Sequence, residues 1–182
     1  MNMAFIKRKP KENRLPTEFE HLSTAPELIK FAQDKGIKTT PLDVPELTRA
    51  LGIKMRFEPM DGEESGSLEK DKESGDWIMV VNSLHHFNRQ RFTIAHEIGH
   101  YIKHSMHSDS FQDKTFFRNG ETNRLEIEAN QFAAELLMPA DAYHSYVENI
   151  SQSVEDIAEY FQVSSMAVRI RAKQLGYEGH NV

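Results

Sequence analysis

Two histidines four residues apart, with a glutamate directly after the first, constrain this chain more than any other feature. The segment from Arg91 to Tyr101 reads Arg-Phe-Thr-Ile-Ala-His-Glu-Ile-Gly-His-Tyr. In a helix, His96 and His100 lie one turn apart on a single face, so both imidazoles can reach one metal ion. Glu97 is too close in sequence to His96 to be a comfortable third ligand, but it is well placed to take a proton from a metal-bound water. The pattern therefore predicts a helix that carries two metal ligands and a general base.

The residues around this motif favour a helix. Asn88 can act as the N-cap, and Phe87 and Phe92 have the spacing of a hydrophobic staple. The apolar stripe that could bury the helix consists of Phe92, Ala95, Ile98, Gly99 and Ile102. Gly99 is a poor helix former, which another element approaching closely would explain. The alternative is an amphipathic helix with two surface histidines, and the choice between the two depends on whether a third ligand exists.

Composition excludes several kinds of protein. The 182 residues suit one domain with small appendages, and 38% apolar residues are enough for a core. A net charge of −6 and a pI near 5.8 give no general reason to expect nucleic acid or an anionic membrane as partner. Because cysteine is absent, neither a disulfide nor a thiolate metal site is possible. No apolar run approaches transmembrane length and the N-terminal segment lacks the apolar core of a signal peptide, so we expect a cytoplasmic location.

The order of predicted elements favours an α+β fold that is mainly helical. Two early helices are expected at residues 24–35 and 43–51, where acidic and hydroxyl residues cap their first turns. Strands are expected at residues 53–58, 65–70 and 77–81. We expect these three strands to form a small antiparallel sheet that leads directly into the helix of His96. His85 and His86 lie in the connecting loop and are interpreted as solvated residues, not as ligands.

The third ligand cannot be His104, although it shares a helical face with His96 and His100. Eight residues of helix span about 12 Å, whereas the ligands of one zinc ion each lie about 2 Å from it. The longer zinc motif His-Glu-x-x-His-x-x-Gly-x-x-His also fails, because Lys103 and Met106 occupy its last two defining positions. The sequence therefore predicts that the third ligand comes from another element.

A second long helix, from Arg124 to Met138, offers two acidic candidates. Glu126 is in phase with the apolar residues of this helix, whereas Glu128 is in phase with its polar residues. A carboxylate on a buried face is costly unless it is paired or binds metal, so Glu126 is the predicted ligand. The alternative for Glu126 is a partly exposed residue that the helix dipole favours near the first turn. Asn130, one turn further on, could orient His96 or His100 by a hydrogen bond.

Other parts of the chain could contribute to a substrate cleft. Residues 109–123 are polar with isolated aromatics and are predicted to form a loop that frames the cleft. A polar edge strand at 66–69 could bind an extended peptide by strand addition. The sequence does not identify the donor that a developing oxyanion needs, and it leaves four candidates, His104, His107, Tyr143 and His144.

Two blocks together resemble a known family. Arg91 to His100 and the later run Glu126-x-x-Ala-Asn-x-Phe-Ala-Ala-Glu-Leu-Leu-Met-Pro139 are similar to the ImmA/IrrE family of bacterial and phage metallopeptidases, and the likeness extends over about residues 25–175. The resemblance implies a thermolysin-like zinc site, with His96, His100 and Glu126 as ligands of Zn²⁺ and Glu97 as general base. It also implies cleavage of a helix-turn-helix regulator of a mobile element or stress response, often encoded nearby.

The C-terminal residues 153–176 have the rhythm of a helix-turn-helix, with the turn at 162–165. Three basic residues of its second helix could contact DNA, namely Arg169, Arg171 and Lys173. Three acidic residues nearby offset them, namely Glu155, Asp156 and Glu159. Because the whole chain is also acidic, a structural or partner-docking role is favoured over direct DNA binding.

The predicted organisation is therefore a flexible basic arm at 1–22, a zincin-like metallopeptidase domain at 23–140 and a C-terminal helical subdomain at 141–182. The predicted function is zinc-dependent endopeptidase activity on a regulatory protein. One alternative is a zinc-containing, non-proteolytic partner of a transcriptional regulator or toxin–antitoxin component, although such a protein has no need of Glu97 as a base. A second alternative is a DNA-binding regulator that uses the C-terminal helices.

Overall fold

The computed structural model describes residues 19–61, 64–106, 108–113 and 124–177, and within them the chain forms seven helices and four strands. The helices are α1 (Ala25–Asp34), α2 (Val44–Ala50), α3 (Phe87–His104), α4 (Arg124–Leu137), α5 (Ala140–Asn149), α6 (Val154–Phe161) and α7 (Ser165–Gln174). The strands are β1 (Lys54–Glu58), β2 (Gly66–Lys70), β3 (Trp77–Asn82) and β4 (Ser110–Asp113). The α+β class with mainly helical content is as predicted.

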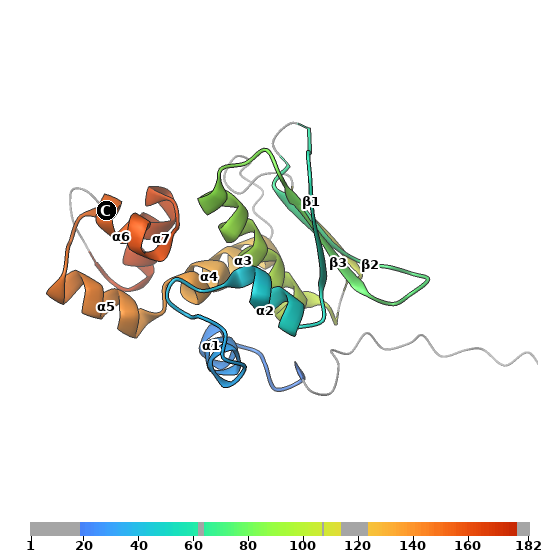
Figure 1. The fold of residues 1–182 in the computed structure, drawn as a ribbon, viewed down its shortest axis with the longest axis horizontal. Helices are drawn as coiled ribbons and strands as arrows, with labels where there is room; N and C mark the ends of the chain where they lie inside the picture. The colour runs from blue at the N-terminus through green and yellow to red at the C-terminus, as the bar shows by residue number, and fades with distance from the viewer. Residues whose placement is uncertain (1–18, 62–63, 107, 114–123, 178–182) are drawn as a thin grey trace, which may run out of the picture.

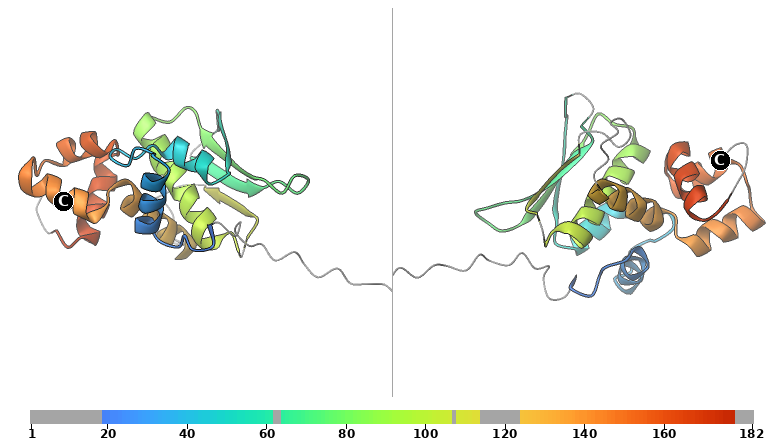
Figure 2. Two further views of the ribbon diagram at one scale, coloured as in Figure 1. Left: turned by 60° about the horizontal axis from the view of Figure 1, so that its bottom comes forward. Right: turned by 180° about the vertical axis from the view of Figure 1, so that it is seen from behind.

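The molecule has the sheet at one end and the last three helices at the other (Figure 1). Helices α3 and α4 lie between them, and both further views show the same order (Figure 2). Helix α3 packs against β2 and β3 on one side and against α4 on the other. The helix with the His-Glu-x-x-His motif is therefore covered by the sheet and by the helix that carries Glu126.

The prediction of a three-stranded antiparallel sheet is wrong in its topology. The sheet has four strands in the order β1-β3-β2-β4, and β1 runs parallel to β3, with Met55 opposite Met79. Strand β2 pairs antiparallel with both of its neighbours, β3 and β4. Strand β3 is the most apolar of the four, and alternate residues of it are fully buried, so it takes a central position with a neighbour on each side. Strand β1 is polar and mostly exposed, which suits an edge.

The connection from β1 to β2 passes over β3, and one buried amide side chain fixes both of its ends. Asn82, at the end of β3, donates from Nδ2 to the carbonyl oxygens of Met60 and Glu64, at 3.2 and 2.8 Å. Its Oδ1 accepts from the backbone N–H of Leu84 at 3.0 Å. These bonds satisfy a fully buried side chain and tie the connection to the start of α3. Sequence patterning does not reveal such a crossing, because each strand alone is equally compatible with pairing to its sequence neighbour.

The fourth strand lies in the segment that was predicted to be a loop. Residues 110–113 pair with β2, with Phe111 opposite Leu68, while residues 114–123 lie outside the described part of the chain. Phe111 is only 8% exposed, and its ring stacks on Trp77 with centroids 6.4 Å apart. Strand β2 is consequently an interior strand, so the predicted edge strand at 66–69 is also wrong. The edge strands of the described sheet are β1 and β4.

The start of α3 differs from the predicted cap. His86 is the N-cap, and its Nδ1 accepts from the N–H of Asn88 at 3.2 Å. The side chain of Asn88 instead donates to the carbonyl of Val163 at 2.9 Å, which joins α3 to the turn between α6 and α7. Phe87 is 56% exposed and therefore forms no buried staple. An imidazole nitrogen can accept in the place of an Asn oxygen, so both residues were chemically able to cap this helix.

One hydrophobic core extends through all the layers. It includes Leu22 before α1, Ile98 of α3, Leu136 of α4 and Phe161 of α6. Of the predicted basic arm, residues 1–18 lie outside the described residues, while Phe19 and Leu22 are buried in this core. No helix in the described part of the chain combines the length and the apolar character that crossing a membrane requires.

Candidate metal centre

Helix α3 places the two motif histidines in the interior of the molecule. His96 is fully buried and His100 is 1% exposed, and their Nε2 atoms lie 3.0 Å apart. The alternative of two surface histidines therefore does not apply. Burial lowers the pKa of His96, although Glu126 opposes this shift, so the ring is held as the neutral imidazole that a metal ligand must be.

Helix α4 brings one carboxylate to both rings. Glu126 Oε2 lies 3.2 Å from Nε2 of His96, and its Oε1 lies 3.3 Å from Nε2 of His100. Burial alone would raise the pKa of Glu126, but hydrogen bonds from His100 and His96 lower it, and the net direction is downward. These three residues are the group in the described chain whose ligand atoms could hold one metal ion.

The three side chains are close enough together to share one metal ion. One ligand atom from each lies within 4.8 Å of the other two, and the ligands of a tetrahedral zinc ion lie roughly 3.3–3.4 Å from one another. Two imidazoles and a carboxylate leave one position for water or substrate, as in catalytic zinc sites. Glu126 keeps 31% of its side chain exposed, so the group is reachable from solvent on that side.

Glu97 is fully buried beside this group but is not part of it. Strand β2 crosses α3 at this point, and Gly66 makes the crossing possible. A Cβ atom on Gly66 would lie 2.6 Å from Cγ2 of Thr93, 2.8 Å from the carbonyl oxygen of Val80 and 3.6 Å from Oε1 of Glu97. The glycine therefore lets the sheet close over the predicted base.

Each imidazole is held from behind by a second hydrogen bond. Nδ1 of His96 lies 3.0 Å from Oδ1 of Asn130, which was predicted from the sequence to orient His96 or His100. Nδ1 of His100 lies 3.0 Å from Nδ1 of His104. Phe111 also stacks on the His100 ring, with a centroid distance of 4.6 Å and an interplanar angle of 14°. The rings of His96 and His100 are thus held in position and orientation.

The contact between His104 and His100 is part of a longer series of hydrogen bonds that was not predicted from the sequence. Nε2 of His104 lies 3.3 Å from Oε2 of Glu128, whose Oε1 accepts from Nε of Arg124 at 2.8 Å. Glu128 was predicted to face solvent and Glu126 to be buried, yet their side chains are 34% and 31% exposed. The degree of burial therefore does not distinguish the two carboxylates. The direction of each side chain does, because Glu126 points to His96 and His100, whereas Glu128 points to His104.

The remaining histidines and the candidates for the oxyanion donor have contacts of their own. His85 contacts Asn82, and His86 caps α3. Tyr143 stacks on Phe161, and Nδ1 of His144 lies 2.6 Å from the hydroxyl of Tyr177, so both are engaged among the C-terminal helices. His107 lies outside the described residues. Both ring nitrogens of His104 also have partners, namely His100 and Glu128.

The chain is similar in sequence to known metallopeptidases. Residues 48–173 match the peptidase M78 family, described as the IrrE N-terminal-like domain. The chain is 30% identical over 118 residues to the metallopeptidase ImmA of Bacillus subtilis (strain 168), a match that covers 63% of this chain and 66% of that protein, just under two thirds of its length. It is 32% identical over 133 residues to a protein of Bacillus phage phi105 called "uncharacterized immunity region protein 2", covering 72% and 80% of the two chains.

A solved structure has a similar fold. It is described as a Mycobacterium tuberculosis transcriptional regulator and superposes with a TM-score of 0.58, covering 86% of this chain and 48% of that one. Since the sequence identity is 16%, this likeness shows the fold alone.

Proposed function

Because the chain belongs to the ImmA/IrrE family of metallopeptidases, we propose that it is a zinc-dependent endopeptidase that cleaves a regulatory protein. The observation that carries this proposal is the convergence of His96, His100 and Glu126 beside the buried Glu97. Three ligands that leave one open position, next to a carboxylate that is not a ligand, suit hydrolysis better than a purely structural site.

In this mechanism His96, His100 and Glu126 would hold Zn²⁺, which would supply Lewis-acid chemistry at the scissile carbonyl. Glu97 takes the proton of the attacking water and then passes it to the leaving amine. Its burial beneath β2 excludes bulk water from that proton transfer. Asn130 orients the ring of His96 and His104 orients the ring of His100 during the reaction.

The proposed substrate is a helix-turn-helix transcriptional regulator encoded near this chain's gene. The name of the phage relative places that protein in an immunity region, and the name of the bacterial relative identifies it as a metallopeptidase. The phage name supports a role connected with phage immunity, and the bacterial name supports peptidase activity.

The C-terminal helices are proposed to be a docking or structural subdomain at 141–182, following a catalytic domain at 23–140. Arg171, one of the three basic residues considered for DNA binding, is 6% exposed and donates from Nε to the carbonyl of Met138 at 2.9 Å. It therefore joins α7 to the residue that follows α4, and its positive charge is not available on the exposed face of α7. This arrangement favours a structural use of the helices over direct DNA binding.

The test is the substitution Glu97→Gln in the full chain, incubated with the product of the adjacent regulator gene. We expect the variant to bind zinc like the parent, as measured by metal analysis, and to lose cleavage by about a hundredfold or more. Glu148→Gln, on the exposed surface of α5, is the matched control and should cleave normally. Unchanged cleavage by Glu97→Gln would remove this residue from the mechanism. Zinc-dependent binding without cleavage by the parent would favour the non-proteolytic alternative.

A further inference from the structure

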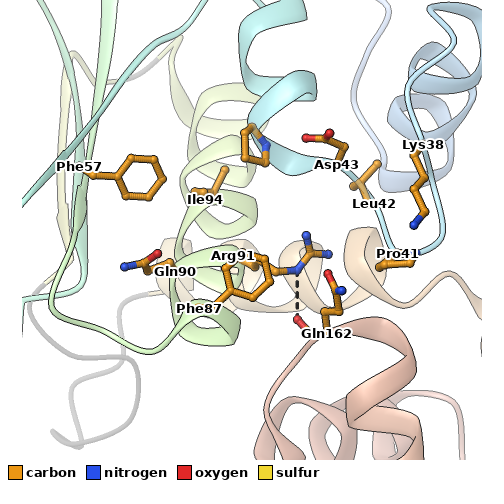
Figure 3. A pocket seen from close by; sticks show the side chains of 11 residues that line it. Lys38, Pro41, Leu42, Asp43, Phe57, Phe87, Gln90, Arg91, Ile94 and Gln162 are labelled. Carbon is orange, nitrogen blue, oxygen red and sulfur yellow. Dashed lines mark hydrogen bonds between the residues drawn. The ribbon is translucent and has the colours of Figure 1, made fainter.

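We propose that the recess between α2, the start of α3, β1 and the turn after α6 is a binding site for a small carboxylate that carries an apolar group. The recess has a volume of about 270 Å³ and lies on a different face of α3 from the histidines. It is drawn in Figure 3. This inference does not depend on peptidase activity, because it concerns neither the metal ligands nor Glu97.

The first reason is a buried cation without a paired anion. Arg91 is 5% exposed, and among its possible acceptors it uses the carbonyl oxygen of Gln162, at 3.1 Å from Nε. Its Nη2 is buried and has no hydrogen-bond partner in the described residues. Asp43 attracts the guanidinium electrostatically, but no carboxylate in that part of the chain forms an ion pair with it. Buried charges in proteins are normally paired, so Arg91 retains the capacity to bind an anion.

The second reason is the charge of the recess. Its lining includes Lys38 and Arg91 as cations and Asp43 as an anion, which leaves a formal charge of +1. Asp43 Oδ1 is already committed to the N-terminus of α2, because it accepts from the N–H of Glu46 at 2.9 Å. In the view of Figure 3 the guanidinium lies between Asp43 and Gln162. A carboxylate is the anion best matched to the two parallel N–H donors of a guanidinium.

The third reason is the apolar wall. Phe57 of β1 and Phe87 of α3 line the recess and remain 48% and 56% exposed, which is unusual for side chains of this size. The Arg91 guanidinium also lies 5.7 Å from the centre of the Phe87 ring. A ligand whose apolar group lies against these rings and whose carboxylate contacts Arg91 and Lys38 would cover the exposed rings and pair the cations at the same time. The volume admits a ligand about the size of one acylated amino acid.

Such a ligand would connect two parts of the molecule. Arg91 and Ile94 belong to the same helix as the metal ligands, whereas Gln162 belongs to the turn between α6 and α7. Occupation of the recess would therefore stabilise the packing of the C-terminal helices on α3, and a bound ligand should raise the melting temperature of the full chain.

The experiment is a titration of the ¹⁵N-labelled full chain with N-acetyl-L-phenylalanine, followed by NMR. We expect saturable shifts of the Arg91 Nε–H and of the side-chain amides of Gln90 and Gln162. The neutral amide of the same compound and acetate alone are the control probes, and each should bind at least about tenfold more weakly because each lacks one half of the recognition.

Two variants test the assignment of the charges. Arg91→Lys should weaken binding of N-acetyl-L-phenylalanine about tenfold or more, since lysine cannot present two parallel donors. Lys38→Gln, at an exposed position, should weaken it about two- to fivefold, and it guards against loss of folding in the first variant. Lys30→Gln on α1 removes the same charge outside the lining and should leave binding unchanged. Absence of saturable shifts, or equal binding of the acid and its amide, would overturn the proposal.

Discussion

At the scale of single residues, the hydrogen bonds behind His100 indicate which ring nitrogens of His100 and His104 carry a proton. If Nε2 of His100 is free to bind a metal, its Nδ1 carries the hydrogen and donates to Nδ1 of His104. Nε2 of His104 then carries a hydrogen and donates to Glu128, whose charge is balanced by Arg124. These hydrogen bonds all run from His100 towards Glu128, and each ring carries one proton. His104 is thus a positioning residue for His100, although it is too far along the helix to be a ligand.

Replacing His104 by phenylalanine should consequently weaken zinc binding. The ring volume is retained, but the acceptor for His100 is lost, and loss of such partners typically costs 10- to 100-fold in metal affinity. Competition with a chromophoric chelator measures the change. Glu128→Gln should cause a smaller loss, because the amide oxygen still accepts, while Glu148→Gln should have no effect. Parental affinity in His104→Phe, with zinc binding intact in the parent, would show that the contact has no orienting role.

Gly66 is the second residue where one atom decides the local structure. In Gly66→Ala the new Cβ meets Thr93 and the backbone of Val80 at 2.6 and 2.8 Å, so β2 has to move away from α3. We expect a loss of about 1–3 kcal/mol in the free energy of unfolding, measured by urea denaturation. Adding Thr93→Ser removes the methyl group and should restore part of the loss. If the double variant is no more stable than the single one, the clash with Thr93 is not the cause.

At the scale of elements, the contact of α3 with α4 assembles the candidate metal centre. A Cβ on Gly99 would lie 3.2 Å from Phe132 Cδ1 and 3.3 Å from Cα of Ala129. The poor helix former is therefore explained by close packing, as the sequence suggested. Because one helix carries the two histidines and the other carries Glu126, their separation determines whether three ligands can share one ion.

Helix α1 illustrates how a cap predicted from sequence forms as expected. Thr24 and Glu27 make the capping box, and Glu27 also accepts from the backbone N–H of Ser23 at 2.9 Å. The Ser23 backbone bond, followed by the Thr24 side chain, lowers the pKa of Glu27 from 4.5 to about 2.

The stability of this cap should therefore depend on pH in a defined window. A carboxyl whose pKa is lowered by folding stabilises the folded state above its unfolded pKa, and that stabilisation is lost as the pH falls from 4.5 towards 2. A ¹³C NMR titration of the Glu27 carboxyl should give a midpoint near 2 in the parent chain. Thr24→Ala and Ser23→Ala should each move this midpoint upwards. A parental midpoint near 4.5 would contradict the capping contacts.

At the scale of the whole molecule, the core does not divide at the boundary between residues 140 and 141. Met138 at the end of α4 is fully buried, and the same cluster includes Tyr143, Ile157 and Val168 of the later helices. Arg91 and Arg171 add hydrogen bonds across this boundary, to Gln162 and Met138. The two proposed subdomains should consequently unfold as one unit.

Two probes can test this cooperativity. Trp77 is the single tryptophan of the chain and reports on the sheet, whereas circular dichroism at 222 nm reports on the helices at the other end as well. We expect the two urea transitions to coincide, as two-state unfolding requires. A chain that ends after residue 140 should expose part of the core and lose this transition. An earlier transition seen by circular dichroism alone would indicate that the last helices unfold independently.

The sequence by itself determined the local parts of this protein. The spacing of His96, Glu97 and His100 on one helix, the placing of Glu126 and Asn130 one turn apart on the next, and the cap at Thr24 all follow from helical periodicity and short-range hydrogen bonding. These are interactions within one or two turns, or patterns that repeat with the pitch of a helix, so they can be inferred without knowing which elements meet.

The tertiary structure alone decided the rest. The parallel pairing of β1 with β3, the strand at 110–113 and the contact of His104 with Glu128 all join residues that are distant in sequence. Glu126 and Glu128 have nearly the same exposure, and only the crossing of two helices points one carboxylate at His96 and His100 and the other at His104. Periodicity shows which face of an element is inward, but the partner of that face depends on packing across the whole core.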